Sequence, residues 1–373
     1  MPAVGPAAPH EKIQLGQWLR LVQTAGVGVG TALCLLKEIG LPSEIFATDC
    51  ATLAALVGHR IAQALTASPT DPVQALIERT MDWLDQPGNH LLTLADTHYP
   101  PALLDIHDPP ILLYAKGRLE LLQRVGLAVV GSRNATAQGV VNAEKFAAAA
   151  SHAGVTVVSG MALGIDTAAH SGGLCGVGST VAVIGTGIDI VYPARNRALA
   201  HRIAADGCLV SEYALGTPAM ASNFPRRNRL ISGLSRAVLV IEAAAQSGSL
   251  ITARVAAEQG RDVFAIPGSI HSPLSKGCHQ LIKQGAKLVE SAQDILDELA
   301  VSSRMGAALP EAVVAPLSDT AGLLAAMGFD PVDGDALAGR AGLDAAALST
   351  QLLSLEMQGL LEILPGGKYR RVG

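Results

Sequence analysis

The sequence predicts an α/β protein with an extended Rossmann-like, mainly parallel sheet, a small helical domain before it and a winged helix after it. Short valine-rich segments bounded by glycine or proline recur through the middle of the chain, and alanine-rich stretches separate them. Continuous apolar strands of this kind are typical of a parallel sheet covered by helices on both faces. Leucines at helical spacing come before this region, and a helix, helix, helix, hairpin pattern comes after it.

The composition is that of a multidomain globular protein. A chain of 373 residues exceeds the roughly 150 residues of a typical domain. A net charge of -5 excludes a histone-like polycation, so any anion-binding site must be local. The 5 cysteines are far apart and form no C-x-x-C pair, which argues against a disulfide framework or a zinc site. We therefore expect a reducing, cytoplasmic location, with no metal and no cofactor.

The amino-terminal segment does not resemble a targeting signal. It lacks a charged start followed by an apolar stretch, and no later apolar run approaches the roughly 20 residues that span a bilayer. We expect an untargeted, soluble protein that does not associate with membranes.

The first domain is expected at 11–67 and is rich in leucine and alanine. Glycines at 26, 28 and 30 precede Thr31, a candidate N-cap, and apolar residues then recur at helical spacing. This order is similar to a helix-hairpin-helix, in which a SAM-like helical domain presents backbone amides to DNA phosphates. A glycine turn in a packing module without DNA contact explains the pattern equally well, so both interpretations stay open.

The second domain is expected at 68–301 and contains the predicted sheet. Crossover connections in such a sheet place ligands at the carboxyl ends of the strands. The predicted strands are 127–131, 155–159, 180–185, 209–212, 237–242 and 262–267.

The end of the chain predicts a linker at 302–317 and a winged-helix domain at 318–373. Helices are expected at 319–327, 335–340 and 344–358, and strands at 360–364 and 368–372, joined by a Pro-Gly-Gly turn. The third helix would read duplex DNA in a transcription factor, yet it has no lysine or arginine and carries Glu356. A docking helix without cations favours contact with protein over contact with DNA.

Two strand-end loops are candidate anion sites. In the first, Gly131 permits close backbone approach, Ser132 can donate a hydrogen bond and Arg133 supplies a cation, ahead of a helix that starts near Thr136. Either loop alone could be an ordinary tight turn, but two adjacent loops favour a pocket.

The second loop runs over 159–166, with Ser159 and Gly160 where an anion would lie. Asp166 is expected to cap the next helix, or to accept a hydrogen bond from Arg133 or a base edge. His170 is interpreted as a packing residue. A third loop, 184–189 before Tyr192, is interpreted as a shaping turn.

The most informative segment is Asn223-Phe-Pro-Arg-Arg-Asn-Arg229, an arginine-rich loop in an acidic chain. Unpaired arginines resist burial, so the segment is expected to face an anion or water. Phe224 beside Arg226 suits single-stranded nucleic acid, because a ring stacks on a base while guanidiniums pair with phosphates. A solvated charge run is the alternative. Downstream, another helix start adds an amide-rich anion pocket at Ser247, Gly248 and Ser249.

Taken together, these motifs closely resemble the DNA-processing protein A family, DprA, also called Smf. The matching segments between residues 99 and 288 are VVGSR, SGMALGID, the glycine turn before Tyr192-Pro193, FPRRNRLISGLS, SGSLITA, GRDVFAIPG and KGCHQLI.

The resemblance implies a recombination mediator without chemistry of its own. Such a protein protects incoming single-stranded DNA, forms a homodimer and loads a RecA-type recombinase during natural transformation. One departure is Ala221, where some members have a DNA-contacting lysine; Arg227 or another nearby cation is expected to compensate. Motif by motif, the strand pocket would comprise Gly131, Ser132, Arg133, Ser159, Gly160, Asp166, Phe224, Arg226, Asn228 and Arg229, to which the residue pattern adds Asn223, Arg227 and Ser247 to Ser249.

Two other classes of function compete with this interpretation. Nucleotide phosphoribohydrolases share the core fold, which by itself cannot decide function. When their glycine-rich loop is laid on 248–252, however, Arg254 stands where the catalytic acid belongs, and an arginine cannot serve as a general base. Glu212 and Glu242 remain as strand-end carboxylates and are interpreted as structural ligands of backbone amides. A regulator that reads duplex DNA through the winged helix is disfavoured by the acidic third helix.

Overall fold

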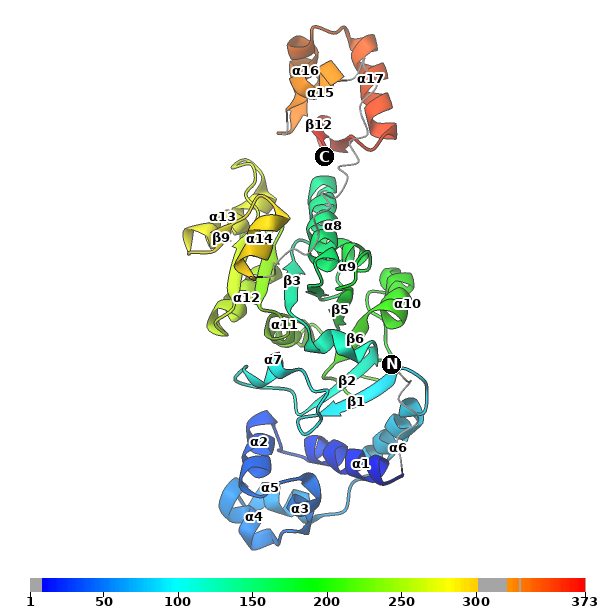
Figure 1. Cartoon of the computed structure of the whole chain (residues 1–373), viewed down its shortest axis with the longest axis vertical. Helices are drawn as coiled ribbons and strands as arrows, with labels where there is room; N and C mark the ends of the chain where they lie inside the picture. Colours follow the sequence, from blue (N-terminus) through cyan, green and yellow to red (C-terminus); the bar gives the residue numbers. More distant parts are fainter. Residues whose placement is uncertain (1–8, 301–320, 329, 373) are drawn as a thin grey trace.

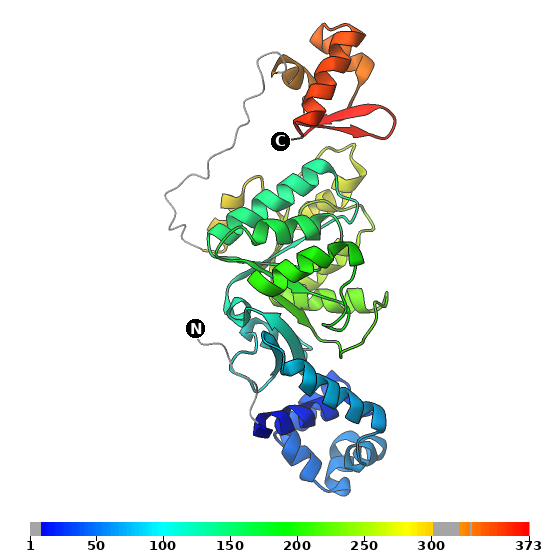
Figure 2. The same cartoon turned by 90° about the vertical axis from the view of Figure 1, so that its right-hand side faces the viewer.

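The computed structural model describes residues 9–300, 321–328 and 330–372. They form a helical module, a central α/β core and a carboxy-terminal winged helix (Figures 1 and 2). The linker predicted at 302–317 and the first residues of the helix predicted at 319–327 lie outside the described residues, as does most of the amino-terminal segment.

The helical module packs around Trp18, Leu35 and Leu53, which are all buried. Its second helix begins at Val29, three residues earlier than a cap at Thr31 implies, because Gly28 takes the extended conformation of an N-cap. The expected capping role of Thr31 is therefore wrong. The domain limits at 11–67 stay a prediction, although a sixth helix beyond them packs on the first through Ile77 and Gly16. The helices are α1 (Pro9–Gln23), α2 (Val29–Glu38), α3 (Pro42–Ala47), α4 (Cys50–Val57), α5 (His59–Thr66) and α6 (Asp71–Leu84).

Nine strands of the described residues form the core sheet, in the order β1-β2-β6-β5-β4-β3-β7-β8-β9. Neighbours from β6 to β9 are parallel, as predicted, whereas β1 and β2 add an antiparallel edge that the sequence did not predict. All six predicted strands are confirmed. Four are one or two residues shorter than expected, and those predicted at 127–131 and 209–212 keep their length but begin one residue earlier. The strands are β1 (Asn89–Thr93), β2 (Leu112–Gly117), β3 (Gly126–Val130), β4 (Thr156–Ser159), β5 (Thr180–Val183), β6 (Cys208–Ser211), β7 (Ala237–Val240), β8 (Asp262–Ala265) and β9 (Lys287–Leu288).

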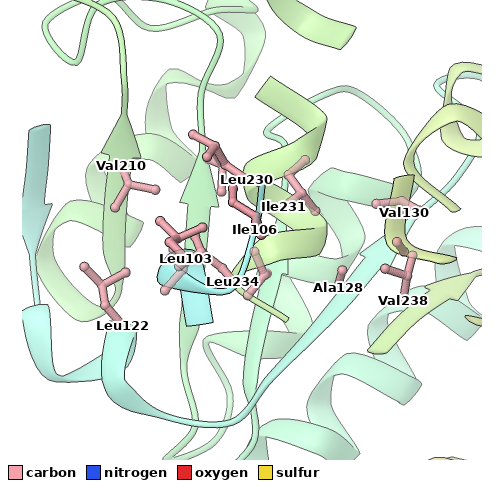
Figure 3. Packing of buried hydrophobic residues seen from close by; sticks show 14 of the residues in the cluster. Leu103, Ile106, Leu122, Ala128, Val130, Val210, Leu230, Ile231, Leu234 and Val238 are labelled. Atoms are coloured by element: carbon pink, nitrogen blue, oxygen red, sulfur yellow. The ribbon is translucent and has the colours of Figure 1, made fainter. Parts of the chain in front are cut away.

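Helices cover both faces of this sheet, and alternate strand residues face opposite layers. Leu127 and Val129 of β3 pack under α8 (Ala137–His152), α9 (Ile165–Gly173) and α14 (Ala292–Glu298). On the other face, Figure 3 shows α11 and the α7 segment packed over β3, β6 and β7. α10 (Arg197–Asp206) lies next to α9. The helices on the face shown in Figure 3 are α7 (Pro101–Leu104), α11 (Asn223–Gly233), α12 (Gly248–Glu258) and α13 (Lys276–Lys283).

The winged-helix order predicted at the end of the chain is confirmed. Two of its helices begin where an aspartate caps them: Asp333 accepts from the Ala336 N–H at 2.8 Å, and Asp344 accepts from the Ala347 N–H at 2.8 Å. A short strand, β10, was not predicted; it pairs with β12. The elements are α15 (Ala321–Met327), β10 (Val332–Asp333), α16 (Gly334–Ala341), α17 (Ala345–Met357), β11 (Leu361–Leu364) and β12 (Lys368–Arg371).

Among the described residues, no helix is long and apolar enough to cross a membrane. In the same part of the chain, no three histidine, cysteine, aspartate or glutamate side chains gather as metal ligands would.

Candidate nucleic-acid interface

The arginine-rich segment is the start of a helix and not a loop. α11 begins at Asn223, and Pro225 lies in its first turn, where a proline costs no intrahelical hydrogen bond. Arg227 is 4% exposed and Arg229 is 9% exposed, whereas Arg226 faces solvent. The expectation that all three arginines face an anion or water is therefore wrong for two of them, because each finds acceptors inside the fold.

Arg227 connects the ends of two neighbouring strands. Its Nη1 donates to the Gly160 carbonyl at 2.6 Å and to the Val183 carbonyl. Burial lowers the pKa of Arg227 to about 10, and nearby Asp166 opposes this shift. Because its guanidinium is buried, Arg227 does not replace the lysine missing at Ala221.

Arg229, two residues after Arg227 in α11, pairs with two carboxylates. It contacts Glu212 and, through Nε at 3.1 Å, Asp108. Burial raises the pKa of Glu212, and the charge of Arg229 opposes this shift. The predicted role of Glu212 as a ligand of backbone amides is thus corrected: it balances a buried arginine.

The loop after β4 is an internal support and not a surface for an anion. The Ser159 hydroxyl is buried and donates to the Val129 carbonyl at 2.7 Å. Asp166 accepts from the Gly160 N–H at 3.1 Å and from the Ala162 N–H at 3.2 Å. The expected direct contacts of Ser159, Gly160 and Asp166 are therefore wrong for this structure, and Asp166 closes the preceding loop instead of capping α9.

His170 is a packing residue, as predicted. The ring is fully buried, Nδ1 lies 2.8 Å from the Thr180 hydroxyl, and Nε2 accepts from the Met161 N–H at 3.3 Å. Burial lowers the pKa of His170 to about 3, and the charge of Arg227 acts in the same direction. The imidazole is neutral at physiological pH.

The loop after β3 is tightly packed and presents one cation. A Cβ at Gly131 would lie 2.7 Å from Cγ1 of Ile165 and 2.9 Å from the Glu242 carbonyl, so this glycine serves loop packing. Ser132 is mostly buried, and its hydroxyl accepts from the Asn134 N–H at 3.1 Å. Arg133 is exposed, and its guanidinium lies 5.9 Å from the centre of the Phe224 ring.

An aromatic pair lies beside Arg133. Phe224 is half-buried, and its ring centre is 5.5 Å from that of Tyr192, with 37° between the ring planes. Tyr192 is 50% exposed. The sequence interpretation treated this region as a shaping turn and missed Tyr192; the Tyr-Pro pair directly after a strand-end glycine turn was the available signal. Asn196 holds the segment in place by donating to the Met161 carbonyl at 2.8 Å.

Glu242, at the end of β7, is a structural ligand of α8, as predicted. It accepts from the Thr136 N–H at 3.0 Å and from the Thr136 hydroxyl. Gly139 makes room for it, since a Cβ there would lie 2.4 Å from the carboxylate carbon. Burial raises the pKa of Glu242, while its bonds to Thr136 act against the rise.

The last predicted loop is a helix start, as expected. Ser247 caps α12, its hydroxyl accepts from the Ser249 N–H at 3.3 Å, and Gly248 is exposed.

The predicted site residues thus divide into an exposed rim and a buried support. Asn223 belongs to the support, because its side chain donates to the Gly185 carbonyl at 3.1 Å. Solvent reaches, at least in part, Gly131, Arg133, Phe224, Arg226, Asn228, Ser247 and Gly248. Buried are Ser132, Ser159, Gly160, Asp166, Asn223, Arg227, Arg229 and Ser249.

The fold and this rim define an α/β protein with a carboxy-terminal winged helix whose candidate ligand site lies at the carboxyl ends of parallel strands. Residues 90–300 match the model of the DNA recombination-mediator protein A family, and residues 307–367 match the DprA winged helix domain. The chain belongs to the DNA recombination-mediator protein A family.

Relatives from two bacteria match more than half of this chain. Protein Smf of Escherichia coli is 43% identical over 304 residues, which are 79% of this chain and 80% of that protein. DNA processing protein DprA of Streptococcus pneumoniae is 50% identical over 206 residues, 55% of this chain and 73% of that protein. The X-ray structure of the pneumococcal protein superposes with a TM-score of 0.65 at 38% identity, covering 76% of this chain and 97% of that one.

A second solved structure describes a single-stranded DNA binding mode of DNA processing protein A from Helicobacter pylori. It superposes with a TM-score of 0.52 at 29% identity and covers 57% of this chain and 96% of that one.

Proposed function

We propose that this protein binds single-stranded DNA at the exposed rim and acts as a recombination mediator without catalysing a reaction on the DNA. The main observation in support of this proposal is the pair of Phe224 and Tyr192 beside the exposed Arg133, at the carboxyl ends of the core strands. Aromatic faces stack on bases of any sequence, and guanidiniums pair with phosphates. The Helicobacter pylori relative supports this proposal, since its structure concerns single-stranded DNA binding.

The cations of the rim are free to meet phosphate. Arg133 and Arg226 are exposed, and neither forms an ion pair with any residue that the structure describes. Their ionic contacts with DNA would release counterions, so binding should weaken as salt rises. Arg226 then replaces Arg227 as the cation that compensates for Ala221.

Further parts of the proposal follow from membership of the family. The protein protects incoming single-stranded DNA, forms a homodimer and loads a RecA-type recombinase in the cytoplasm during natural transformation. The winged helix contacts protein instead of duplex DNA. In support, α17 exposes Leu353 and Met357, 58% and 82% exposed, where a DNA-reading helix would carry cations.

The competing hydrolase would need a free strand-end carboxylate. Glu212 is paired with Arg229 and Glu242 caps α8, while Arg254 stands on α12 at the position expected for the acid. These engagements support a non-enzymatic role. Release of free base from AMP by the purified protein would contradict it.

The test of the proposed function is a salt titration of binding to oligo-dT and to a duplex of the same length. We expect tighter binding to the single strand at every salt concentration, with affinity falling as salt rises. Equal or stronger binding to the duplex would overturn the proposal.

A further inference from the structure

The winged-helix domain contacts the core beside the rim. The views in Figures 1 and 2 agree in placing the β11–β12 wing next to α8. Glu362 of β11 accepts from the N–H of Ala137, the first residue of α8, at 2.9 Å. This N–H has no intrahelical acceptor, because the first turn of a helix leaves its donors free.

A second wing residue completes the contact. Arg370 stands directly opposite Glu362 in the β11–β12 hairpin and donates to its carboxylate. The two side chains are 12% and 18% exposed, so the ion pair is largely removed from water. Arg370 also lies close enough to the core carboxylate Glu242 to stabilise its charged form. One guanidinium thus pairs with one carboxylate at this helix end and favours the charge of a second.

The contact lies between two loops of the candidate interface, the Arg133 loop after β3 and the Ser247 loop after β7. α8 begins four residues after Arg133, and Glu242 precedes the Ser247 loop. β3 and β7, which carry these loops, are adjacent and parallel. A helix N-terminus attracts anions through its free amides and its dipole. The wing carboxylate therefore occupies a position suited to a phosphate group at the start of α8, the helix that follows the Arg133 loop.

The charges at this contact also work against docking. The Nε of Arg370 is buried without a hydrogen-bond partner among the described residues. Two carboxylates at one helix end repel each other, so the docked state carries costs that an undocked wing does not. When a polyanion reaches the start of α8, the Glu362 carboxylate can leave the helix end and be solvated by water.

We propose that the winged helix is an autoinhibitory domain: Glu362 holds the place of a DNA phosphate at the start of α8, and binding of single-stranded DNA and docking of the wing exclude each other. The inference rests on the proposed function. A ligand whose competent state is only partly populated binds with an affinity reduced by that fraction. Releasing the wing must therefore tighten binding of the strand.

The experiment compares full-length variants by their affinity for oligo-dT and by the tumbling of the wing. Glu362→Ala should bind oligo-dT roughly threefold to tenfold more tightly than the parent. The double variant Glu362→Ala/Arg370→Ala, which leaves the net charge unchanged, should show the same gain. Glu356→Ala removes the same charge from an exposed position on α17 and should leave affinity unchanged.

A variant on the core side tests the docking without altering the wing. Ala137→Pro removes the N–H that Glu362 accepts, and proline suits the first helical position because Thr136 before it is extended. Nitrogen-15 relaxation of the β11–β12 amides should show faster tumbling in Ala137→Pro and in Glu362→Ala than in the parent.

The outcomes separate the two proposals. Tighter binding together with faster wing tumbling supports autoinhibition. Unchanged affinity of both Glu362 variants, or a wing that still tumbles with the core, overturns autoinhibition and leaves the proposed function standing. Failure of every variant and of the parent to bind oligo-dT overturns the proposed function, and the autoinhibition with it.

Discussion

At the residue scale, three neighbouring arginines have different roles although they share one helix. Arg226 projects into solvent, Arg227 holds two strand ends together, and Arg229 balances two carboxylates. Burying a charged group is tolerated only when it is paired and hydrogen-bonded. Substitutions at these positions should therefore separate effects on DNA binding from effects on stability.

Arg226→Ala should weaken oligo-dT binding without unfolding the protein. Loss of one phosphate contact should flatten the dependence of log affinity on log salt by roughly 0.7. The control is Arg236→Ala, an exposed arginine directly before β7 and so at the opposite edge of the sheet. If the salt dependence of affinity were the same in the parent and in both variants, Arg226 would not contact a phosphate.

Arg229→Ala should instead destabilise the fold. It leaves the buried carboxylate of Glu212 without its partner, and breaking a buried ion pair costs about 3–5 kcal/mol. Urea denaturation followed by circular dichroism measures the loss. A variant as stable as the parent, but with a flattened salt slope, would restore the sequence-based view that Arg229 faces the strand.

Tyr192→Ala should reduce affinity for oligo-dT by about 1–3 kcal/mol if a base stacks on the exposed ring. Tyr192→Phe keeps the ring and should bind like the parent, because stacking does not need the hydroxyl. Both affinities can be measured by fluorescence anisotropy at one salt concentration. Equal losses in the two variants would assign the effect to the hydroxyl and contradict stacking.

At the element scale, helix α8 depends on a carboxylate supplied by a distant strand. Glu242 reaches Thr136 across Gly139, whose missing side chain leaves the space. Gly139→Ala should therefore lower the unfolding free energy by about 1–2 kcal/mol, because the carboxylate must leave its donors. Thermal unfolding measures the change.

Gly30→Ala is the matched control for that prediction. Gly30 lies in α2 with open space around it, so alanine there should be neutral or should stabilise the protein by up to about 1 kcal/mol. If both substitutions stabilised the protein, the proposed role of Gly139 would be wrong.

The sequence predicted those elements whose pattern is local. The six core strands consist mainly of buried apolar residues, and the winged-helix elements carry caps and a turn within a few residues. β1 was not predicted, because Asn89-His90 begins an edge strand with polar residues. The start of α11 was interpreted as an arginine-rich loop, although Pro225 is compatible with a first helical turn.

The candidate site was harder to predict than the fold, for a physical reason. Whether an arginine is exposed depends on acceptors far away in the sequence, and Arg227 finds its own at Gly160 and Val183. The same holds for Tyr192, which becomes a candidate site residue because its ring lies against that of Phe224, distant in the sequence. The sequence indicated loops that the structure places at the carboxyl ends of neighbouring strands, while only the packing separates the rim from its support.

At the scale of the whole molecule, acid stability should depend on the buried His170. An imidazole in the unfolded chain has a pKa near 6.5, whereas burial lowers the pKa of His170 to about 3 in the folded chain. Between these values the unfolded chain binds a proton that the folded chain excludes. The stabilising contribution is thus complete above pH 6.5 and is lost as the pH falls toward 3.

The contribution of His170 to the slope of unfolding free energy against pH should approach about 1.4 kcal/mol per pH unit in that window. Pulsed hydrogen exchange at β4 and β5 after equilibration in urea, at several pH values between about 7 and 4, measures it in the core itself. His170→Gln should show a smaller slope, whatever its absolute stability, whereas His201→Gln, which removes an exposed histidine from α10, should keep the parent's slope. Identical slopes for all three proteins would mean that the folded core takes up the proton at His170, and hence that the ring is not sealed from water as its packing indicates.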